Sequence, residues 1–185
     1  MTVSLGYMNL SINLLGLVQP KLYPLLRTLM DQLQSGIRIT VRAVIVQDNK
    51  ILLIKKDSPS DGIRYTLPGG ALESGETLHE AVIRECQEEI NTAVEAFDIL
   101  HVADFFIPKL LPQPYTRHQL EVLIQCKAPI DYTPNSGSEP DKHQVGVEWL
   151  ALDDLAKHTI SPNFFAELLI NLQSSDHPIY VGSVA

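Results

Sequence analysis

The sequence predicts an α/β fold in which helices cover a mixed β-sheet. Apolar and polar residues alternate from Ile37 to Ile45, which indicates a half-buried strand. An amphipathic helix follows near residues 76–90, and a second one begins near residue 161. Strands before and after a central helix, with another helix at the end, are typical of a mixed sheet between helices.

Residues 1–36 have a different pattern and predict a helical extension. Five leucines recur there at helical spacing, with Pro24 acceptable in a first turn and Gly36 as a stop. They are Leu22, Leu25, Leu26, Leu29 and Leu33. This leucine stripe can pack on the chain's own core or against a second subunit. The second alternative would make the protein a homodimer.

The first sheet element is expected to be a hairpin over residues 37–56. Asp48 and Asn49 supply the turn between its two strands. A loop over 57–62 then leads to Leu67-Pro-Gly69-Gly70. The two glycines allow a tight turn in which backbone comes close to a ligand.

The second half of the domain predicts further strands and a closing helix. Strands are expected at 94–107 and 117–126, separated by a stiff, partly apolar loop at 108–115. A loop at 131–144 precedes a strand, turn and short helix at 145–155. Ser161 as N-cap and Pro162 at the first helical position begin the last helix. Its apolar side carries Phe164, Phe165, Leu168, Leu169 and Leu172, and residues 176–185 are interpreted as a tail.

Composition limits the function classes. The chain has 185 residues and a formal net charge of −8, which argues against a broad nucleic-acid surface. A phosphate substrate stays compatible with this charge because a bound metal can invert it locally.

We also expect a cytoplasmic protein without a membrane segment. No apolar run reaches the ~20 residues of a membrane span, and the N-terminus lacks the basic region of a signal peptide. Cys86 and Cys126 have neither zinc nor CxxC spacing, so we interpret them as reduced core thiols.

The central helix carries the residues that are most informative about function. Glu85, Glu88 and Glu89 are spaced i, i+3 and i+4, so their carboxylates lie side by side on one helix face. Like charges this close repel one another. A divalent cation with oxygen ligands is the simplest reason for such an arrangement.

A purely structural interpretation of this helix explains some of its acids but not all. Leu78, Val82, Cys86 and Ile90 form the apolar stripe, which Ala81 widens. A ladder of Glu76, Glu80, Arg84 and Glu88 could be a solvated face, and such a face also suits Glu73. Glu85 and Glu89 instead project beside the apolar stripe, where solvation does not explain them.

The segment from Gly70 to Thr92 resembles the signature of the Nudix hydrolases. Gly70, Glu76, Arg84, Glu85, Glu88 and Glu89 all stand at the spacing of that signature. Three uncharged positions depart from it, with Cys86 and Thr92 in place of aliphatic residues and Asn91 in place of a glycine. Asn is the next-best residue for a left-handed position after a helix.

The resemblance implies a Nudix-type α/β/α sandwich for residues 37–175 and a phosphoanhydride hydrolase activity. It implies Mg²⁺ as cofactor, with Mn²⁺ as a substitute, held by Glu85, Glu88, Glu89 and the carbonyl of Gly69. Glu85 and Glu88 are the candidate catalytic bases inside the motif. Arg84 completes the catalytic set as the residue that orients a carboxylate.

Some residues outside the motif are alternative candidates. Glu139, Asp141 and His143 lie in the second loop, and Glu121 lies in a strand pattern from which it could reach the metal. His118 is interpreted as structural. The substrate-binding candidates are Tyr115, Arg64 and Gly70.

The expected substrate is a small-molecule nucleotide. We place a nucleoside diphosphate linked to another group first, of the ADP-ribose type. A nucleoside triphosphate losing pyrophosphate is the alternative within the same enzyme class. A non-catalytic nucleotide sensor is the alternative of another class.

Overall fold

The computed structural model describes residues 36–109, 115–170 and 178–184. The chain divides into two compact units, of which Gly36–Ile107 with His118–Ala185 is the larger. The other unit comprises Met1–Ser35 and Pro108–Arg117. The predicted leucine stripe and the centre of the 108–115 loop lie outside the described residues.

The described chain forms seven strands, two α-helices and a 3-10 helix. The strands are β1 (Arg38–Gln47), β2 (Lys50–Ser58), β3 (Gly62–Thr66), β4 (Glu95–Lys109), β5 (Tyr115–Lys127), β6 (Gln144–Ala151) and β7 (Tyr180–Val184). The helices are α2 (Leu78–Ile90), the 3-10 helix Leu152–Lys157, and α3 (Phe164–Ile170). Among the described residues, no helix has the length and apolar character needed to cross a membrane.

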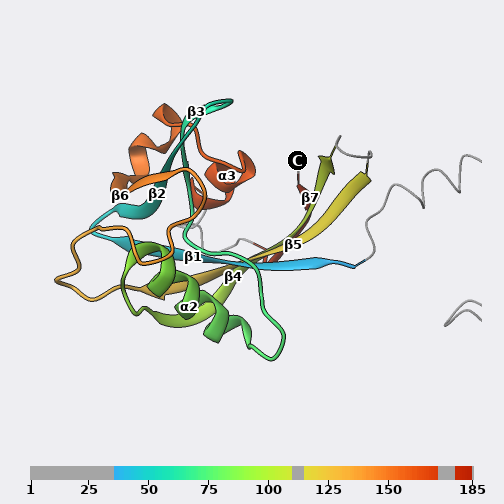
Figure 1. Cartoon of the computed structure of the whole chain (residues 1–185), viewed down its shortest axis with the longest axis horizontal. Coiled ribbons are helices and arrows are strands. Elements are labelled where there is room, and N and C mark those ends of the chain that lie inside the picture. Colours follow the sequence, from blue (N-terminus) through green and yellow to red (C-terminus); the bar gives the residue numbers. More distant parts are fainter. Residues whose placement is uncertain (1–35, 110–114, 171–177, 185) are drawn as a thin grey trace, which may run out of the picture. The chain divides into compact units, whose positions relative to one another are not determined.

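The strands form one mixed sheet, as expected. Their order is β3-β2-β1-β5-β4-β7, and β6 adds to β2. The pairs β1–β5 and β4–β7 are parallel, whereas β2 pairs antiparallel with β1, β3 and β6. The α/β/α arrangement is confirmed, because α2 and α3 lie on opposite sides of this sheet (Figure 1).

The centre of the sheet is buried on both faces. In β1, Val41 and Ala43 belong to the core beneath α2, while Val44 belongs to the core beneath α3. The expectation of a half-buried strand was therefore wrong for β1, where even the polar Thr40 is only 2% exposed. Helix α3 covers the face that the alternation assigned to solvent.

The predicted hairpin forms at its turn but opens beyond it. Asp48 and Asn49 adopt positive φ angles of 49° and 60°, as a tight hairpin turn requires. However, β1 and β2 pair only at Val46–Ile51 and Gln47–Lys50. Farther along β1, the segment 67–72 takes the position beside it, so this segment is held by strand-like hydrogen bonds.

Three local expectations need correction. Residues expected as a loop at 57–62 largely belong to the β2–β3 hairpin. Helix α3 begins at Phe164 rather than near Pro162, because the Ser161 N–H donates to the Tyr65 carbonyl and holds residue 161 against β3. Strand β7 lies in the segment interpreted as a tail, where a five-residue run gave no clear pattern.

Both ends of helix α2 match the sequence signals. Thr77 is the N-cap: its side chain accepts from the Glu80 N–H, and the Glu80 side chain accepts from the Thr77 N–H. Asn91 ends the helix in the left-handed conformation, at φ 53°. Local sequence signals therefore set where the helix that carries the motif acids begins and ends.

The cap gives a test of local stability. Thr77→Ala removes the hydrogen bonds of the Thr77 hydroxyl with Glu80 and is expected to lower the free energy of unfolding by about 1 kcal/mol. Urea unfolding monitored by circular dichroism would measure the loss. His79→Ala, an exposed change in the same turn, serves as control. Equal midpoints for the two variants would show that the capping box contributes no stability.

Candidate functional site

The Gly69–Gly70 turn is held against β1 by backbone hydrogen bonds. The N–H groups of Val41 and Ala43 donate to the carbonyls of Gly70 (2.9 Å) and Pro68 (2.8 Å). Gly69 adopts φ +135°, and a Cβ there would lie 2.1 Å from the Val41 carbonyl oxygen. Only glycine fits this position, for both conformational and steric reasons.

Gly70 provides the surface on which Glu85 lies. A Cβ on Gly70 would lie 2.4 Å from Oε1 of Glu85 and 2.6 Å from its Oε2. The carboxylate therefore sits directly over the glycine backbone. This contact explains the motif glycine, and Gly70 stays a candidate substrate contact.

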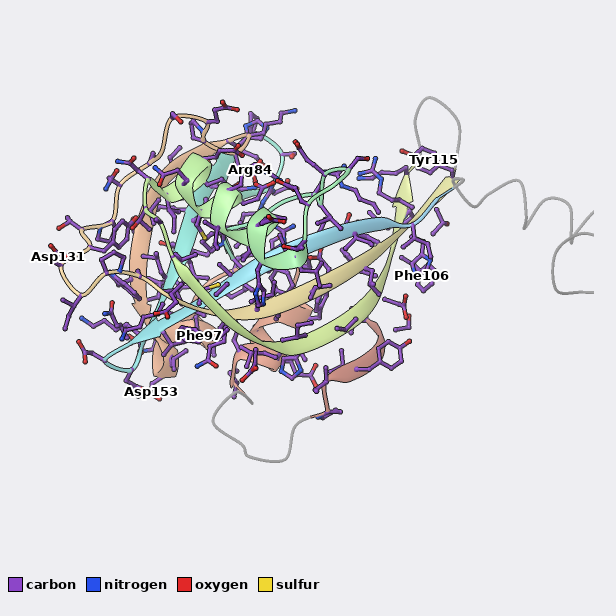
Figure 2. All side chains as sticks on the ribbon, turned by 90° about the horizontal axis from the view of Figure 1, so that it is seen from below. Arg84, Phe97, Phe106, Tyr115, Asp131 and Asp153 are labelled. Carbon is purple, nitrogen blue, oxygen red and sulfur yellow. The ribbon has the colours of Figure 1, made fainter. Side chains whose placement is uncertain are left out.

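Figure 2 labels Arg84 on helix α2. Its guanidinium connects four groups of the site. Nε and Nη2 donate to the two oxygens of Glu76 (2.7 and 3.1 Å), and Nη1 donates to Glu85 (2.9 Å) and Glu88 (3.0 Å). Nη2 also donates to the Ala71 carbonyl, at 3.0 Å. These bonds equal in number the five N–H groups that an arginine has.

The guanidinium of Arg84 is therefore held by protein oxygens, most of them carboxylate oxygens. Its hydrogen bonds to Glu76, and then to Glu85, raise its pKa and keep it charged. This geometry supports the predicted orienting role. It also shows that Glu76 belongs to the same network.

Glu89 is the most deeply buried acid of the motif, with 5% of its surface exposed. Its Oε2 accepts from the Gly69 N–H at 2.7 Å. Burial raises the pKa of Glu89 to about 8, with further contributions from the negative charges of Asp141 and Glu85. A buried acid beside other acids attracts any cation that can reach it.

Glu85 is in a similar but milder position. Burial raises its pKa, and the neighbouring charge of Glu88 raises it further, against the opposing effect of Arg84. Glu88 is more open, with 32% of its side chain exposed. The three carboxylates thus differ in burial, although they share one helix face.

These residues fit a hard divalent cation by the chemistry of their donors. The oxygens of the three glutamates and of the Gly69 carbonyl are the ligand type that Mg²⁺ and Mn²⁺ prefer. Within the part of the chain that is described, no three acidic, histidine or cysteine side chains already converge as a metal cage. The geometry gives the reason: Arg84 engages Glu85 and Glu88, while Glu89 turns toward Gly69.

Arg42 is a site residue that the sequence pattern missed. Its Nη1 donates to the Gly69 carbonyl at 2.5 Å, and its Nε donates to Glu121 at 3.1 Å. Burial alone would lower the pKa of Arg42. The charge of the fully buried Glu121, its hydrogen bond to Arg42 and the charges of Glu89 and Asp141 together outweigh this and raise the pKa. The alternation in β1 assigned Arg42 to solvent. Its contact with Glu121 of the distant strand β5 has no counterpart in the local sequence pattern.

The second loop brings one of its candidate bases to the site. The Asp141 carboxylate pairs with Lys56, and its charge acts on both Glu89 and Arg42. Glu139 contacts α2 through its backbone N–H, which donates to the Glu88 carbonyl at 3.0 Å. Asp141 is therefore the loop acid that the structure links electrostatically to the motif.

The remaining candidate residues have contacts outside the carboxylate cluster. Arg64 donates to Asp61 and Ser58 within the β2–β3 hairpin. Tyr115 begins β5 and belongs to the smaller unit. His118 bonds Asp104 at 2.5 Å and stacks on Phe106, which agrees with a structural role.

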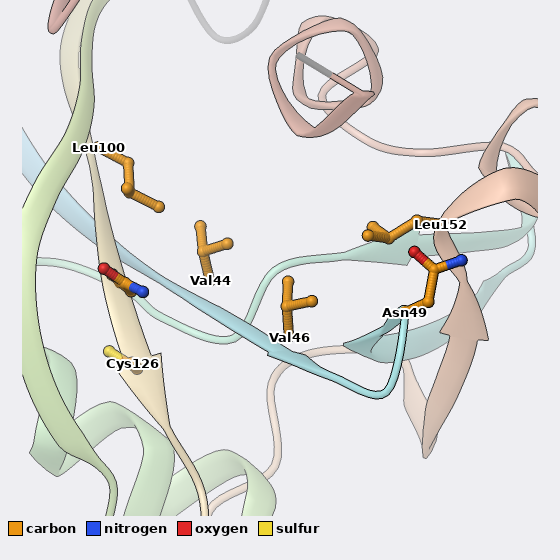
Figure 3. Close-up of a pocket in the computed structure, with 7 residues that line it drawn as sticks. Val44, Val46, Asn49, Leu100, Cys126 and Leu152 are labelled. Atoms are coloured by element: carbon orange, nitrogen blue, oxygen red, sulfur yellow. The ribbon is translucent and has the colours of Figure 1, made fainter. Parts of the chain in front are cut away.

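A cavity of about 290 Å³ lies elsewhere on the sheet. Figure 3 shows Val44, Val46, Leu100 and Leu152 around it. Val44 belongs to the core beneath α3, whereas the motif acids lie on α2. This apolar cavity is therefore separate from the carboxylate site.

Comparison with known proteins agrees with the geometry. Residues 36–169 match the model of the NUDIX domain. An ADP-ribose pyrophosphatase of Methanocaldococcus jannaschii is 46% identical over 65 residues, covering 35% of this chain and 38% of that protein. An RNA pyrophosphohydrolase of Legionella pneumophila is 30% identical over 91 residues, covering 49% of this chain and 51% of that protein. The matched part thus spans between a third and about half of these relatives.

Solved structures show the same fold. A NUDIX hydrolase of Nitrosomonas europaea aligns with a TM-score of 0.60 at 20% identity, covering 82% of this chain and 80% of that one. A MutT NUDIX hydrolase of Burkholderia pseudomallei aligns with a TM-score of 0.56 at 30% identity, covering 77% of this chain and all of that one. Together with the domain match over residues 36–169, the shared fold and the motif geometry establish that this chain belongs to the Nudix hydrolase family.

Proposed function

We propose that the chain is a divalent-metal-dependent pyrophosphohydrolase acting on a nucleoside diphosphate linked to another group. The observation that carries the proposal is the cluster of Glu85, Glu88 and Glu89 on one helix face, with Arg84 holding two of them. The first glycine and all five charged positions of the family signature are present, which favours an enzyme over a non-catalytic sensor.

The reaction needs a nucleophile and charge neutralisation. Water attacks one phosphorus, the bridging P–O bond breaks, and two monophosphates leave. Mg²⁺ or Mn²⁺, held by Glu85, Glu88, Glu89 and the Gly69 carbonyl, would neutralise phosphate charge and lower the pKa of water. Glu85 and Glu88 are the motif candidates for accepting the proton of the attacking water.

The chain's other residues set the pose of these groups. Arg84 fixes Glu85 and Glu88 through Nη1, and Arg42 anchors the turn that carries Gly69. Tyr115, Arg64 and Gly70 are the proposed substrate contacts.

The free, buried Cys86 and Cys126 support a proposed cytoplasmic location.

The substrate proposal follows the named relatives. Two of them are an ADP-ribose pyrophosphatase and a putative ADP-ribose pyrophosphatase of Bacillus subtilis, the latter 33% identical over 86 residues. We therefore place ADP-ribose-like substrates first. A nucleoside triphosphate is the second candidate, supported by the RNA pyrophosphohydrolase relatives.

A substrate panel with Mg²⁺ and Mn²⁺ tests the proposal. We expect ADP-ribose to give AMP and ribose 5-phosphate, with turnover abolished by excess chelator. Chromatography separates this result from release of pyrophosphate, which would favour the triphosphate alternative. Binding of nucleotides without any metal-dependent turnover would instead support a sensor.

Glu89→Gln tests the metal assignment. The amide keeps the size of the side chain but removes the charge that would bind a cation. We expect turnover to fall by about 100-fold or more, because loss of a group that only supports a metal ligand already costs roughly 10- to 100-fold. The circular dichroism spectrum should be unchanged. Glu73→Gln, an exposed acid outside the carboxylate cluster, is the control. Full activity of Glu89→Gln would overturn the assignment.

The pKa of Glu89 predicts how stability changes with pH in chelator. Its value in the fold, about 8, lies above its ordinary value of 4.5. Between these values the folded chain keeps a proton that the unfolded chain releases, so stability must fall as pH rises. We expect the free energy of unfolding to decrease from pH 5 to pH 8, and Glu89→Gln to flatten this decrease. Parallel curves for the two proteins in urea titrations would contradict the raised pKa.

A further inference from the structure

The carboxyl end of α2 packs against the loop 131–144 instead of facing solvent. A helix leaves its last carbonyls without partners inside the helix. Here the N–H groups of Gly137 and Glu139 donate to the carbonyls of Glu89 and Glu88, both at 3.0 Å. The Tyr132 hydroxyl donates to the Ile90 carbonyl at 2.7 Å.

Gln144, at the other end of the loop, also bonds the carboxyl end of α2. Its Nε2 donates to the Glu89 carbonyl at 2.8 Å and to Ser136 at 3.1 Å. Its Oε1 accepts from the Asp141 N–H at 3.1 Å. The same side chain therefore bonds both the helix end and the loop itself.

The contact is too close for any residue but glycine at position 137. A Cβ on Gly137 would lie 2.1 Å from the Glu88 carbonyl oxygen and 2.8 Å from the Gln87 carbonyl oxygen. These are backbone atoms, which cannot rotate away. The φ of Gly137 is not in the left-handed range, so the requirement for glycine here is steric.

The loop is also fastened to the sheet. Asp141 pairs with Lys56 of β2, and the Asp57 N–H donates to the His143 carbonyl at 2.9 Å. The loop thus links the end of α2 to the strand that runs beside the site.

We propose that the loop 131–144, through Gly137 and Gln144, positions Glu88 and Glu89 for cation binding. The bonded carbonyls belong to the same residues that carry these carboxylates, so a shift of the helix end would move both side chains. Gly137 and Gln144 are positioning residues, because they touch the backbone of α2 and not a substrate. The inference rests on the proposed metal-dependent function.

A matched pair of glycine variants tests it. Gly137→Ala must push the loop off α2, whereas Gly146→Ala, a few residues on, adds a Cβ with nothing within 4 Å. Binding of Mn²⁺ to substrate-free protein, followed by electron paramagnetic resonance, gives a readout that needs no turnover. We expect Gly137→Ala to weaken Mn²⁺ binding about 10-fold and Gly146→Ala to leave it unchanged.

Hydrogen exchange of the amides at positions 137 and 139 reports on the contact itself. We expect faster exchange there in Gly137→Ala. Gln144→Met supplies a milder variant should Gly137→Ala fail to fold: it keeps the side-chain length, loses the donor, and should also weaken Mn²⁺ binding. Its apparent activation constant for Mg²⁺ should rise while KM for the nucleotide stays the same.

The outcomes are distinguishable. Wild-type Mn²⁺ affinity in folded Gly137→Ala or Gln144→Met, despite faster exchange at 137 and 139, would overturn the positioning role while leaving the metal site intact. Unchanged exchange in Gly137→Ala would overturn the contact. Failure of the wild-type protein to bind Mn²⁺ would overturn the proposed function and the positioning role together.

Discussion

The packing of Glu85 onto the backbone of Gly70 is the contact on which the rest of the site depends. It requires the segment 67–72 to lie beside β1, and it requires α2 to cross that segment closely enough for the Glu85 carboxylate to reach Gly70. Because β1 pairs with this segment instead of with the length of β2, the sheet opens where the carboxylates meet the turn. The fold therefore produces the site by interrupting its own hairpin.

Two arginines offset the electrostatic repulsion among the closely spaced acidic groups of the site. Arg84 lies among Glu76, Glu85 and Glu88, and Arg42 neutralises the fully buried Glu121. Removing either arginine would leave a partly or fully buried carboxylate without its partner, which is costlier than losing an exposed ion pair. Glu89 is different, since its carboxyl group bonds a backbone N–H rather than an arginine, and burial raises its pKa to about 8.

The features that the sequence predicted are those that depend on neighbours along the chain. The spacing of Glu85, Glu88 and Glu89, the apolar stripe of α2 and the left-handed Asn91 all follow from helix periodicity and backbone preference. Arg42 and Gly137 escaped prediction because their roles come from Glu121 and from the end of α2, far away in sequence. An alternating pattern marks one buried face of a strand, but it does not reveal that a distant acid and a helix bury the other face.

The location of the acids on α2 also bears on their function. Glu88 and Glu89 lie in the last turn of the helix, which contains no basic residue, although the partial negative charge of a helix carboxyl end favours cations there. The loop amides at 137 and 139 offset part of this charge by bonding the carbonyls, but they do not neutralise the side chains. The helix dipole and the carboxylates thus act in the same direction. A cation near these carboxylates would be stabilised by both, which supports the proposed metal site.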